Sequence, residues 1–296
     1  MDDVCLLSRR AVLAASAALL GVPAQGAALS SAARDVMSAL RALEARSGAR
    51  IGVASVDSGT GRAVFWREGE RFRMCSTFKL SLAGAALARA DTGKEDLSRL
   101  VKYEKPVLEV SPATTRNWPR GMTVAQLCEA AIIYSDNTAA NVLLGEIGGP
   151  GAVTAFWRSL GDRTSRLDDV EPKLNVPDGE RNTTTPAAMM ADMKVMLLGE
   201  ALSAASRARL LGWMAANRTG GKMLRAGLPP SWRVADKTGH WMGEGNAASV
   251  NDLAFITPPD RAPILAAVFT NGGSGDDDAR VAVVADVGQI LAKAFA

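Results

Sequence analysis

A hydroxyl and an amine stand three residues apart in Ser76-Thr77-Phe78-Lys79. Positions with this spacing share one face of a helix, so the Lys79 amine can reach the Ser76 hydroxyl. A serine needs such a partner because its own hydroxyl is a weak nucleophile at neutral pH. Burial and the positive end of a helix both disfavour the charged form of Lys79, which makes it a better proton acceptor. Alone, the pattern is weak, since Ser-x-x-Lys occurs by chance in many helices.

A second polar group, Ser135-Asp136-Asn137, interrupts an apolar helical stretch between Ile133 and Val142. These residue types favour helix caps and turns, so a joint between two helices, capped by Asp136 or Asn137, explains them without any chemistry. The functional interpretation is that Ser135 relays a proton and that the Asn137 amide binds a substrate carbonyl.

A third group, Lys237-Thr238-Gly239, ends a predicted strand. Lys237 would attract a carboxylate, Thr238 would hydrogen-bond to it, and Gly239 would let a ligand approach the backbone closely. A surface strand that ends in lysine is the simpler interpretation of this group taken alone.

The three patterns together are far more specific than any one of them. In this order they are the set shared by class A β-lactamases and penicillin-binding proteins. The segment from Arg166 to Pro186, which contains Glu171-Pro172 and Asn175, resembles the omega loop of class A β-lactamases. The similarity extends over essentially the whole mature chain, and on these residues the chain is identified as a member of the class A serine β-lactamases.

This resemblance implies a two-step hydrolysis of the β-lactam ring of penicillins and cephalosporins, which gives antibiotic resistance. Ser76 would form the acyl-enzyme, with Lys79 or Glu171 acting through water as the base. Glu171 would then activate the deacylating water, which Asn175 helps to hold. The resemblance also implies that the backbone amides of Ser76 and His240 are the oxyanion donors. It further implies that the substrate is bound by Asn137, Lys237, Thr238, Gly239 and His240. A cis bond is expected at Glu171-Pro172, and no metal or cofactor is implied.

The chain departs from the family at several positions. Asp169 stands where the family usually has an arginine, and Asn182 stands where it usually has an aspartate, so the ion pair that ties the omega loop shut cannot form. The arginine that assists carboxylate binding in many relatives has no clear counterpart, and Arg280 or Lys222 are candidates. The disulfides of some relatives lack a partner here, so Cys75 and Cys128 are expected to be free and buried.

The periodicity of apolar residues predicts the elements that position these groups. The amino terminus reads as a helix over residues 32–47 and two strands over 50–56 and 62–67; the carboxyl end reads as three strands and a helix. Helices dominate between them. We therefore predict an α/β (α+β) fold in three layers, in which a five-stranded antiparallel sheet flanked by terminal helices packs on an inserted helical domain. We predict a discontinuous α/β domain formed by residues 27–73 and 215–296. Residues 74–214 form the predicted helical domain, which contains the omega loop at residues 166–182.

The first residues indicate an exported protein. Arg9-Arg10, a short apolar run and a small-residue region predict a twin-arginine signal peptide over residues 1–26 and a periplasmic mature protein. The chain has 34 basic and 31 acidic residues and no long block of either sign, which argues against a nucleic-acid partner. With one histidine among 296 residues, a His-based zinc site or a Ser-His-Asp triad is disfavoured. A β-lactam is the expected partner, with no membrane association after signal cleavage, and the family expectation is a monomer.

Three other functions share parts of this pattern. A penicillin-binding D,D-peptidase has the same three motifs, but Glu171 in the loop argues against it. A β-lactam sensor would acylate and stay acylated, and an esterase would use the same Ser-Lys pair. A turnover assay separates the hydrolase from the sensor.

Overall fold

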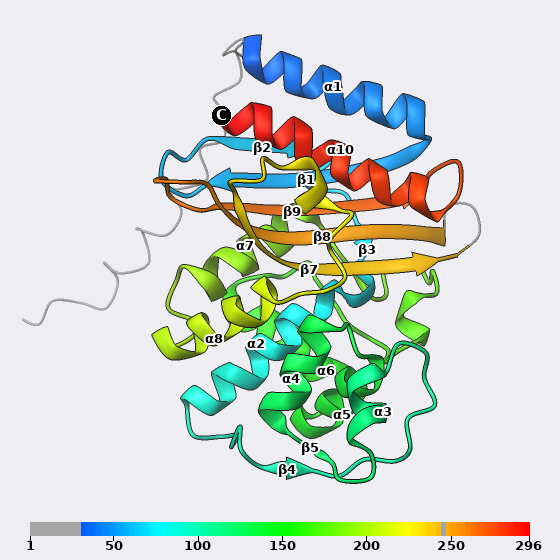
Figure 1. The fold of residues 1–296 in the computed structure, drawn as a ribbon, viewed down its shortest axis with the longest axis vertical. Helices are drawn as coiled ribbons and strands as arrows, with labels where there is room; N and C mark the ends of the chain where they lie inside the picture. Colours follow the sequence, from blue (N-terminus) through cyan, green and yellow to red (C-terminus); the bar gives the residue numbers. More distant parts are fainter. Residues whose placement is uncertain (1–30, 244–246) are drawn as a thin grey trace, which may run out of the picture.

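A five-stranded antiparallel sheet forms the centre of the computed structural model, which describes residues 31–243 and 247–296 (Figure 1). Two strands come from the amino-terminal part and three from the carboxyl-terminal part, so the sheet is built from both ends of the chain, as predicted. Across the sheet the order is β2 (Ala63–Trp66), β1 (Ala49–Asp57), β9 (Ile264–Gly272), β8 (Ala248–Thr257) and β7 (Arg233–Met242). β7 is therefore an edge strand.

Two helices, α1 (Ser31–Ser47) and α10 (Asp277–Phe295), lie side by side over one face of the sheet (Figure 1). Their apolar residues and those of β1, β8 and β9 form one buried cluster, to which Leu40, Ile51 and Val284 belong. Acidic residues in the first turn of α10 and Lys293 in its last turn complement the helix dipole. α1 and α10 are therefore the terminal helices that were predicted to flank the sheet.

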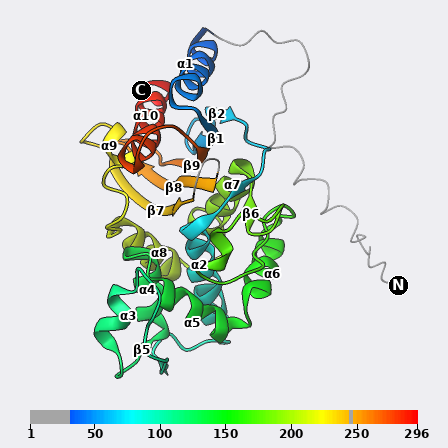
Figure 2. The ribbon, with the colours of Figure 1, turned by 90° about the vertical axis from the view of Figure 1, so that its right-hand side faces the viewer.

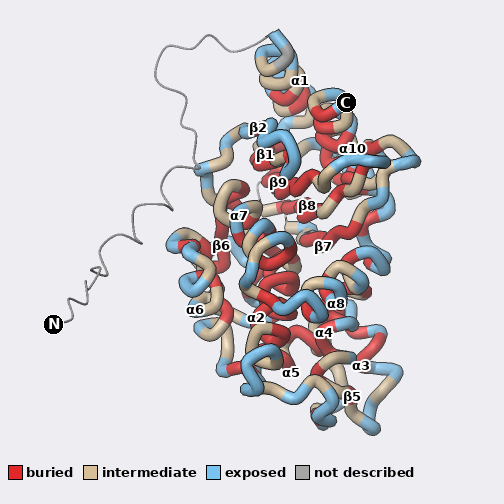
Figure 3. The backbone as a smooth tube through the Cα atoms, turned by 90° about the vertical axis from the view of Figure 1, so that its left-hand side faces the viewer, coloured by how far each residue is buried: buried red, intermediate tan, exposed pale blue. Residues whose placement is uncertain are grey.

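The other face of the sheet packs on a helical layer (Figure 2). Its second apolar cluster surrounds α2, which is buried along most of its length (Figure 3). The longer helices of this layer are α2 (Phe78–Asp91), α4 (Val124–Ile133), α5 (Asn137–Ile147), α6 (Pro150–Leu160), α7 (Pro186–Leu197) and α8 (Ala204–Ala215). Helices dominate this part of the chain, as predicted, and the three-layer α/β fold is confirmed.

Local signals explain several helix starts. Thr123 and Gln126 form a capping box at the start of α4, in which each side chain accepts a hydrogen bond from the other residue's backbone N–H. Thr185 caps α7 through its side chain, and Pro186 occupies the first turn. The prediction that a strand ends at Lys237-Thr238-Gly239 is wrong, because β7 pairs with β8 as far as Met242.

Shorter elements complete the structure, and the sequence analysis did not predict them. They are the helices α3 (Pro112–Asn117) and α9 (Leu224–Gly227), the 3₁₀ turns η1 (Cys75–Thr77) and η2 (Lys173–Asn175), and the paired strands β3 (Phe72–Arg73) with β6 (Thr183–Thr184) and β4 (Leu100–Val101) with β5 (Met122–Thr123). The predicted signal peptide lies outside the described residues. Within the described ranges, no helix combines the length and the apolar character needed to cross a membrane.

Candidate active site

Ser76 lies in η1, immediately before α2, and Lys79 follows it in the first turn of that helix. The Lys79 Nζ donates to the Ser76 Oγ across 2.9 Å, so the helical spacing brings the amine to the hydroxyl as predicted. Lys79 is completely buried, and burial lowers its pKa, although the nearby Glu171 carboxylate opposes this effect. The amine is therefore closer to its neutral, proton-accepting form than an exposed lysine is.

The Glu171 carboxylate contacts both the Ser76 hydroxyl and the Lys79 amine. Its Oε1 accepts a hydrogen bond from the Ser76 Oγ at 3.1 Å and lies 3.0 Å from the Lys79 Nζ. Burial acts to raise the pKa of Glu171, but the Lys79 charge and hydrogen bonds from Lys79, Asn175 and Ser76 outweigh it and leave that pKa lowered. Glu171 is thus held as a carboxylate. We call Ser76, Lys79 and Glu171 the serine cluster.

The omega-loop backbone holds Glu171 in this position. Its N–H donates to the Asn141 Oδ1 at 2.9 Å, and its carbonyl accepts from the Asn141 Nδ2 at 2.8 Å. The Asn175 Nδ2 donates to the Glu171 Oε2 at 2.7 Å, and the Glu171-Pro172 peptide bond is cis, as expected. The carboxylate is therefore fixed through both its backbone and its side chain.

Ser135-Asp136-Asn137 forms the joint between α4 and α5. Asp136 caps α5 through Ala139 N–H, and its other oxygen accepts from two backbone amides in the segment containing α3. Asp136 thus has the structural role that the sequence suggested. Ser135 adopts a left-handed backbone conformation with φ 54°, and the Lys79 Nζ donates to its carbonyl at 2.8 Å and to the Asn137 Oδ1 at 2.6 Å. The joint brings Ser135 and Asn137 to the serine cluster.

Lys237 approaches the same cluster from β7. It is fully buried, and its Nζ donates to the Ser135 Oγ at 3.1 Å and to the Thr238 carbonyl at 2.7 Å. Burial, with the neighbouring Lys79 charge, lowers the pKa of Lys237 to about 7. The Thr238 hydroxyl makes a hydrogen bond with the Thr219 hydroxyl. Lys237 therefore contacts Ser135 directly, whereas Thr238 contacts the segment that follows α8.

Gly239 is required by close packing between β7 and the turn before Ser76. A Cβ atom at this position would lie 2.6 Å from the Met74 carbonyl oxygen and 3.0 Å from the Thr77 side chain. The sequence analysis assigned the glycine to the approach of a ligand. In the structure, it is the backbone of Met74–Thr77 that approaches Gly239 closely, and this contact sets the distance between β7 and the nucleophile.

A cleft of about 760 Å³ opens over these residues. Its lining includes Ser76, Ser135, Asn137, Glu171, Asn175, Thr238 and His240, so seven of the predicted site residues meet in one cavity. Loop 107–110 and the end of β7 contribute an apolar wall, with Val107, Leu108, Val110, Trp241 and Met242. Among the described residues, no group of three or more His, Cys, Asp or Glu side chains is arranged to hold a metal ion.

Comparisons with known proteins agree with this geometry. The model of the β-lactamase enzyme family matches residues 35–295. A β-lactamase of Streptomyces lavendulae is 45% identical over 97% of this chain and 97% of its own, and β-lactamase OXY-2 of Klebsiella oxytoca is 42% identical over 84% and 86%. A solved structure of an ancestral class A β-lactamase is 54% identical and superposes with a TM-score of 0.84, covering 88% of this chain and all of that one.

The chain belongs to the class A β-lactamases. The enzyme is accordingly a β-lactam hydrolase, and the resemblance recognised from the motifs is confirmed. Cys75 and Cys128 of this β-lactamase are free and buried, as expected. Burial raises the pKa of each thiol to about 12, so neither is a reactive thiolate.

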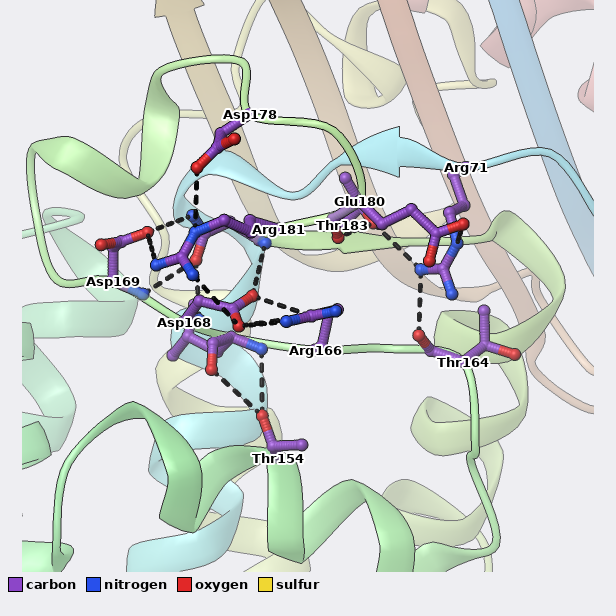
Figure 4. A network of polar contacts seen from close by, with 12 residues as sticks. Arg71, Thr154, Thr164, Arg166, Asp168, Asp169, Asp178, Glu180, Arg181 and Thr183 are labelled. Carbon is purple, nitrogen blue, oxygen red and sulfur yellow. Dashed lines mark hydrogen bonds and ion pairs between the residues drawn. The ribbon is translucent and has the colours of Figure 1, made fainter.

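The β-lactamase closes its omega loop with a different set of charges from the usual pair (Figure 4). We call Asp168, Asp169, Arg181 and Asn182 the loop neck. The Asn182 Oδ1 accepts from the backbone amides of Asp168 at 2.8 Å and Asp169 at 3.0 Å, while its Nδ2 donates to the Asp169 carboxylate at 3.0 Å. Arg181 supplies the cation, 2.8 Å from Asp169. The loop is therefore closed although the usual ion pair cannot form.

The sequence analysis missed several groups that position the site. Asn141, which clamps Glu171, lies four residues after Asn137 and so shares its helix face, a signal that was available. Under Lys237, Arg225 forms an ion pair with the buried Asp236 at 2.6 Å, and Asn217 donates to the same carboxylate at 2.8 Å. These partners follow from the packing of α8 and α9 against β7, and no motif marks them.

Proposed function

We propose that this β-lactamase opens the ring of penicillins and cephalosporins by forming an ester on Ser76 and then hydrolysing it, which confers resistance to these antibiotics. The observation that carries the proposal is the position of the Ser76 Oγ between a buried amine at 2.9 Å and a buried carboxylate at 3.1 Å. Each of the two steps needs a base beside this oxygen, and both candidates are in hydrogen-bond contact with it.

In the first step Ser76 attacks the carbonyl carbon of the ring. Lys79, or Glu171 acting through a water molecule, takes the hydroxyl proton; the contacts of Ser76 support either route. The ring C–N bond then breaks, and Ser135 passes a proton to the nitrogen. The Ser135 Oγ is suited to this transfer because it accepts hydrogen bonds from Lys237 at 3.1 Å and from Lys79 at 3.4 Å.

Substrate binding is assigned to the wall formed by β7 and the α4–α5 joint. The backbone amides of Ser76 and His240 would stabilise the developing oxyanion, and the Asn137 amide would bind the acyl side chain. Lys237 and Thr238 would bind the substrate carboxylate, with Gly239 keeping the strand close to the nucleophile.

In the second step Glu171 accepts a proton from water, which attacks the ester carbon and releases Ser76. The hydrogen bond from Asn175 to Glu171 supports this role, because it orients one carboxylate oxygen while the other faces Ser76. The lowered pKa of Glu171 keeps the carboxylate ionised and able to accept the proton.

We further propose that residues 1–26 are a twin-arginine signal peptide and that the mature enzyme acts as a monomer in the periplasm. The domain division into 27–73 with 215–296, and 74–214, is likewise proposed; its support is that the two apolar clusters lie on opposite faces of the sheet.

Steady-state hydrolysis of a chromogenic cephalosporin, with intact-mass analysis of the protein, tests the mechanism. We expect turnover in the parent enzyme, a stable adduct of one substrate mass in Glu171→Gln, and no adduct in Ser76→Ala. A stable adduct in the parent would indicate a sensor or a D,D-peptidase. Turnover in Glu171→Gln without any adduct would rule out the assignment of Ser76, whereas loss of both turnover and adduct would identify Glu171 as the base of the first step.

A further inference from the structure

His240 stands beside the groups assigned to the substrate carboxylate. Side chains two residues apart on a strand point to the same face, so His240 follows Thr238 along one face of the edge strand β7. Thr219, Thr238 and His240 all line the cleft. The two threonine hydroxyls are hydrogen-bonded to each other, which places a polar row next to the imidazole.

The cleft wall is short of positive charge. Among the described residues that line it, none is lysine or arginine, whereas Glu109 and Glu171 are acidic. Lys237 lies behind the wall, fully buried, and its ammonium group already donates to Ser135 and to the Thr238 carbonyl. A substrate carboxylate in the cleft therefore lacks an exposed cationic partner from lysine or arginine in the part of the chain described.

Nearby cations that the sequence suggested as replacements have other partners. Lys222 forms an ion pair with Asp278 at 2.8 Å, and neither side chain is buried. The Arg280 Nε donates to the Gly273 carbonyl at 3.2 Å. Neither residue lines the cleft. His240 is thus the one residue of the described lining whose side chain can gain a positive charge.

The Asp277 carboxylate holds the imidazole. The His240 Nε2 lies 2.6 Å from the Asp277 Oδ1, and Asp277 begins α10 directly after the N-cap residue Asp276. A protonated imidazole donates from both nitrogens, so with Nε2 bonded to Asp277 its Nδ1 remains available as a second, charged donor. A protonated ring can therefore bind a second carboxylate through Nδ1 while Nε2 stays bonded to Asp277.

We propose that protonated His240 binds the ring carboxylate of the β-lactam, so that substrate affinity depends on the charge of this imidazole. The proposal rests on the proposed function, since it assigns a group to the same substrate. A protonated imidazole attracts a carboxylate more strongly than a neutral one, so substrate binding strengthens when the ring gains its proton. Besides Asp277, the elements that meet at this cleft carry other charged groups: Asp276, Asp278 and Arg280 of α10, Lys222, which is paired with Asp278, Lys237 of β7, and Glu109 in the cleft lining.

The effect must be separated from that of Lys237, whose pKa is lowered to about 7 and whose charge also favours a carboxylate. The comparison is therefore made between the parent, His240→Gln and His240→Arg, with Lys222→Gln as a control that removes a cation outside the cleft. KM and kcat are measured from about pH 5 to 8 with a chromogenic cephalosporin and its methyl ester, which lacks the carboxylate charge.

At the acidic end we expect His240→Gln to raise KM about five- to tenfold over the parent, the range for a partly screened hydrogen bond to a charged group. At the alkaline end of the range, His240→Gln and the parent should have the same KM. His240→Arg should keep the low KM throughout, and Lys222→Gln and the methyl ester should show no such difference. Equal KM values for parent and His240→Gln at every pH would overturn the proposal, as would a difference that persists with the ester.

A second measurement uses the fact that the chain has one histidine. Selective ¹⁵N labelling of histidine reports the charge of this imidazole alone. In the Ser76 adduct trapped with Glu171→Gln, the titration should shift to higher pH with the acid substrate and stay unchanged with the ester. An identical titration in both adducts would overturn the proposal. Absence of turnover in the parent would instead contradict the proposed function, so the two failures are distinguishable.

Discussion

The serine cluster contains Glu171 and the loop neck closes the loop that carries it, but the two regions differ in how much freedom their residues have. In the serine cluster, the amine of Lys79 and the carboxylate of Glu171 each contact the same hydroxyl and each other. In the loop neck, the usual arginine and aspartate are replaced by Asp169 and Asn182, and the loop is still closed. Chemistry fixes the identity of residues in the cluster, whereas the neck needs only a satisfied set of charges and hydrogen bonds.

The largest expected effect is in the serine cluster. Lys79→Ala removes the amine that contacts Ser76, and we expect kcat/KM for a penicillin to fall about a thousandfold or more, as for loss of a general base. Rapid-mixing mass spectrometry should show that acyl-enzyme formation itself is slowed. If Lys79→Ala acylates at the parental rate, the residues of the serine cluster are as replaceable as those of the loop neck.

Asn182→Asp tests the neck at its most buried side chain, which is 1% exposed. The change replaces the donor to Asp169 with a second carboxylate, and we expect the unfolding free energy at pH 7 to fall by about 2 kcal/mol. Protonation relieves the repulsion, so the loss should shrink as the pH is lowered. Denaturant unfolding of the parent and the variant at pH 5 and 7 measures this loss of unfolding free energy.

The double variant Asp169→Arg with Asn182→Asp sharpens this test, because it installs the charge order that the family usually has. We expect it to recover most of the stability and of the turnover lost in Asn182→Asp, with a coupling energy of about 1 to 3 kcal/mol between the two positions. If the two substitutions are simply additive, the neck does not work as one charge-balanced unit.

Arg181 is a smaller contributor, since Asp169 also bonds to Asn182 and to Lys173, whose Nζ lies at 2.7 Å. Arg181→Gln should lower the deacylation rate about twofold, and added salt should produce part of the same effect in the parent. Arg166→Gln is the matched control, because Arg166 pairs with Asp168 and not with Asp169. An equal effect of both variants would argue against Asp169 as the centre of the neck.

The smallest expected effect on activity lies beneath the loop, at Asp192 in α7. Burial and the neighbouring Asp162 charge raise the pKa of Asp192 to about 9. The folded protein holds this proton while the unfolded chain, with a pKa near 3.9, releases it, so the unfolding free energy falls as the pH rises from about 4 to 9. Asp192→Asn should reduce that slope without changing kcat. Parallel pH slopes for parent and variant would contradict the assignment.

Much of the fold was predictable because apolar periodicity and capping residues act locally. The helices around Ser76 and Asn137 and the strands at both ends follow from side-chain patterns over a few turns. The end of β7 was mispredicted because Gly239 and His240 break the apolar pattern, yet pairing with β8 continues the strand to Met242. Hydrogen bonds to a neighbouring strand are not visible in one segment's residue types.

The sequence by itself determined which residues are the candidates for the chemistry. Ser76, Lys79, Ser135, Glu171 and Lys237 were identified from residue type and spacing, together with family resemblance. Only the tertiary structure determined what surrounds them: the Asn141 clamp on Glu171, the recombined charges of the loop neck, and the position of His240 between the cleft and Asp277. The physical reason is the distance along the chain over which each feature is determined. A motif needs only neighbours along the chain, whereas burial, charge balance and hydrogen-bond partners depend on segments that folding brings together.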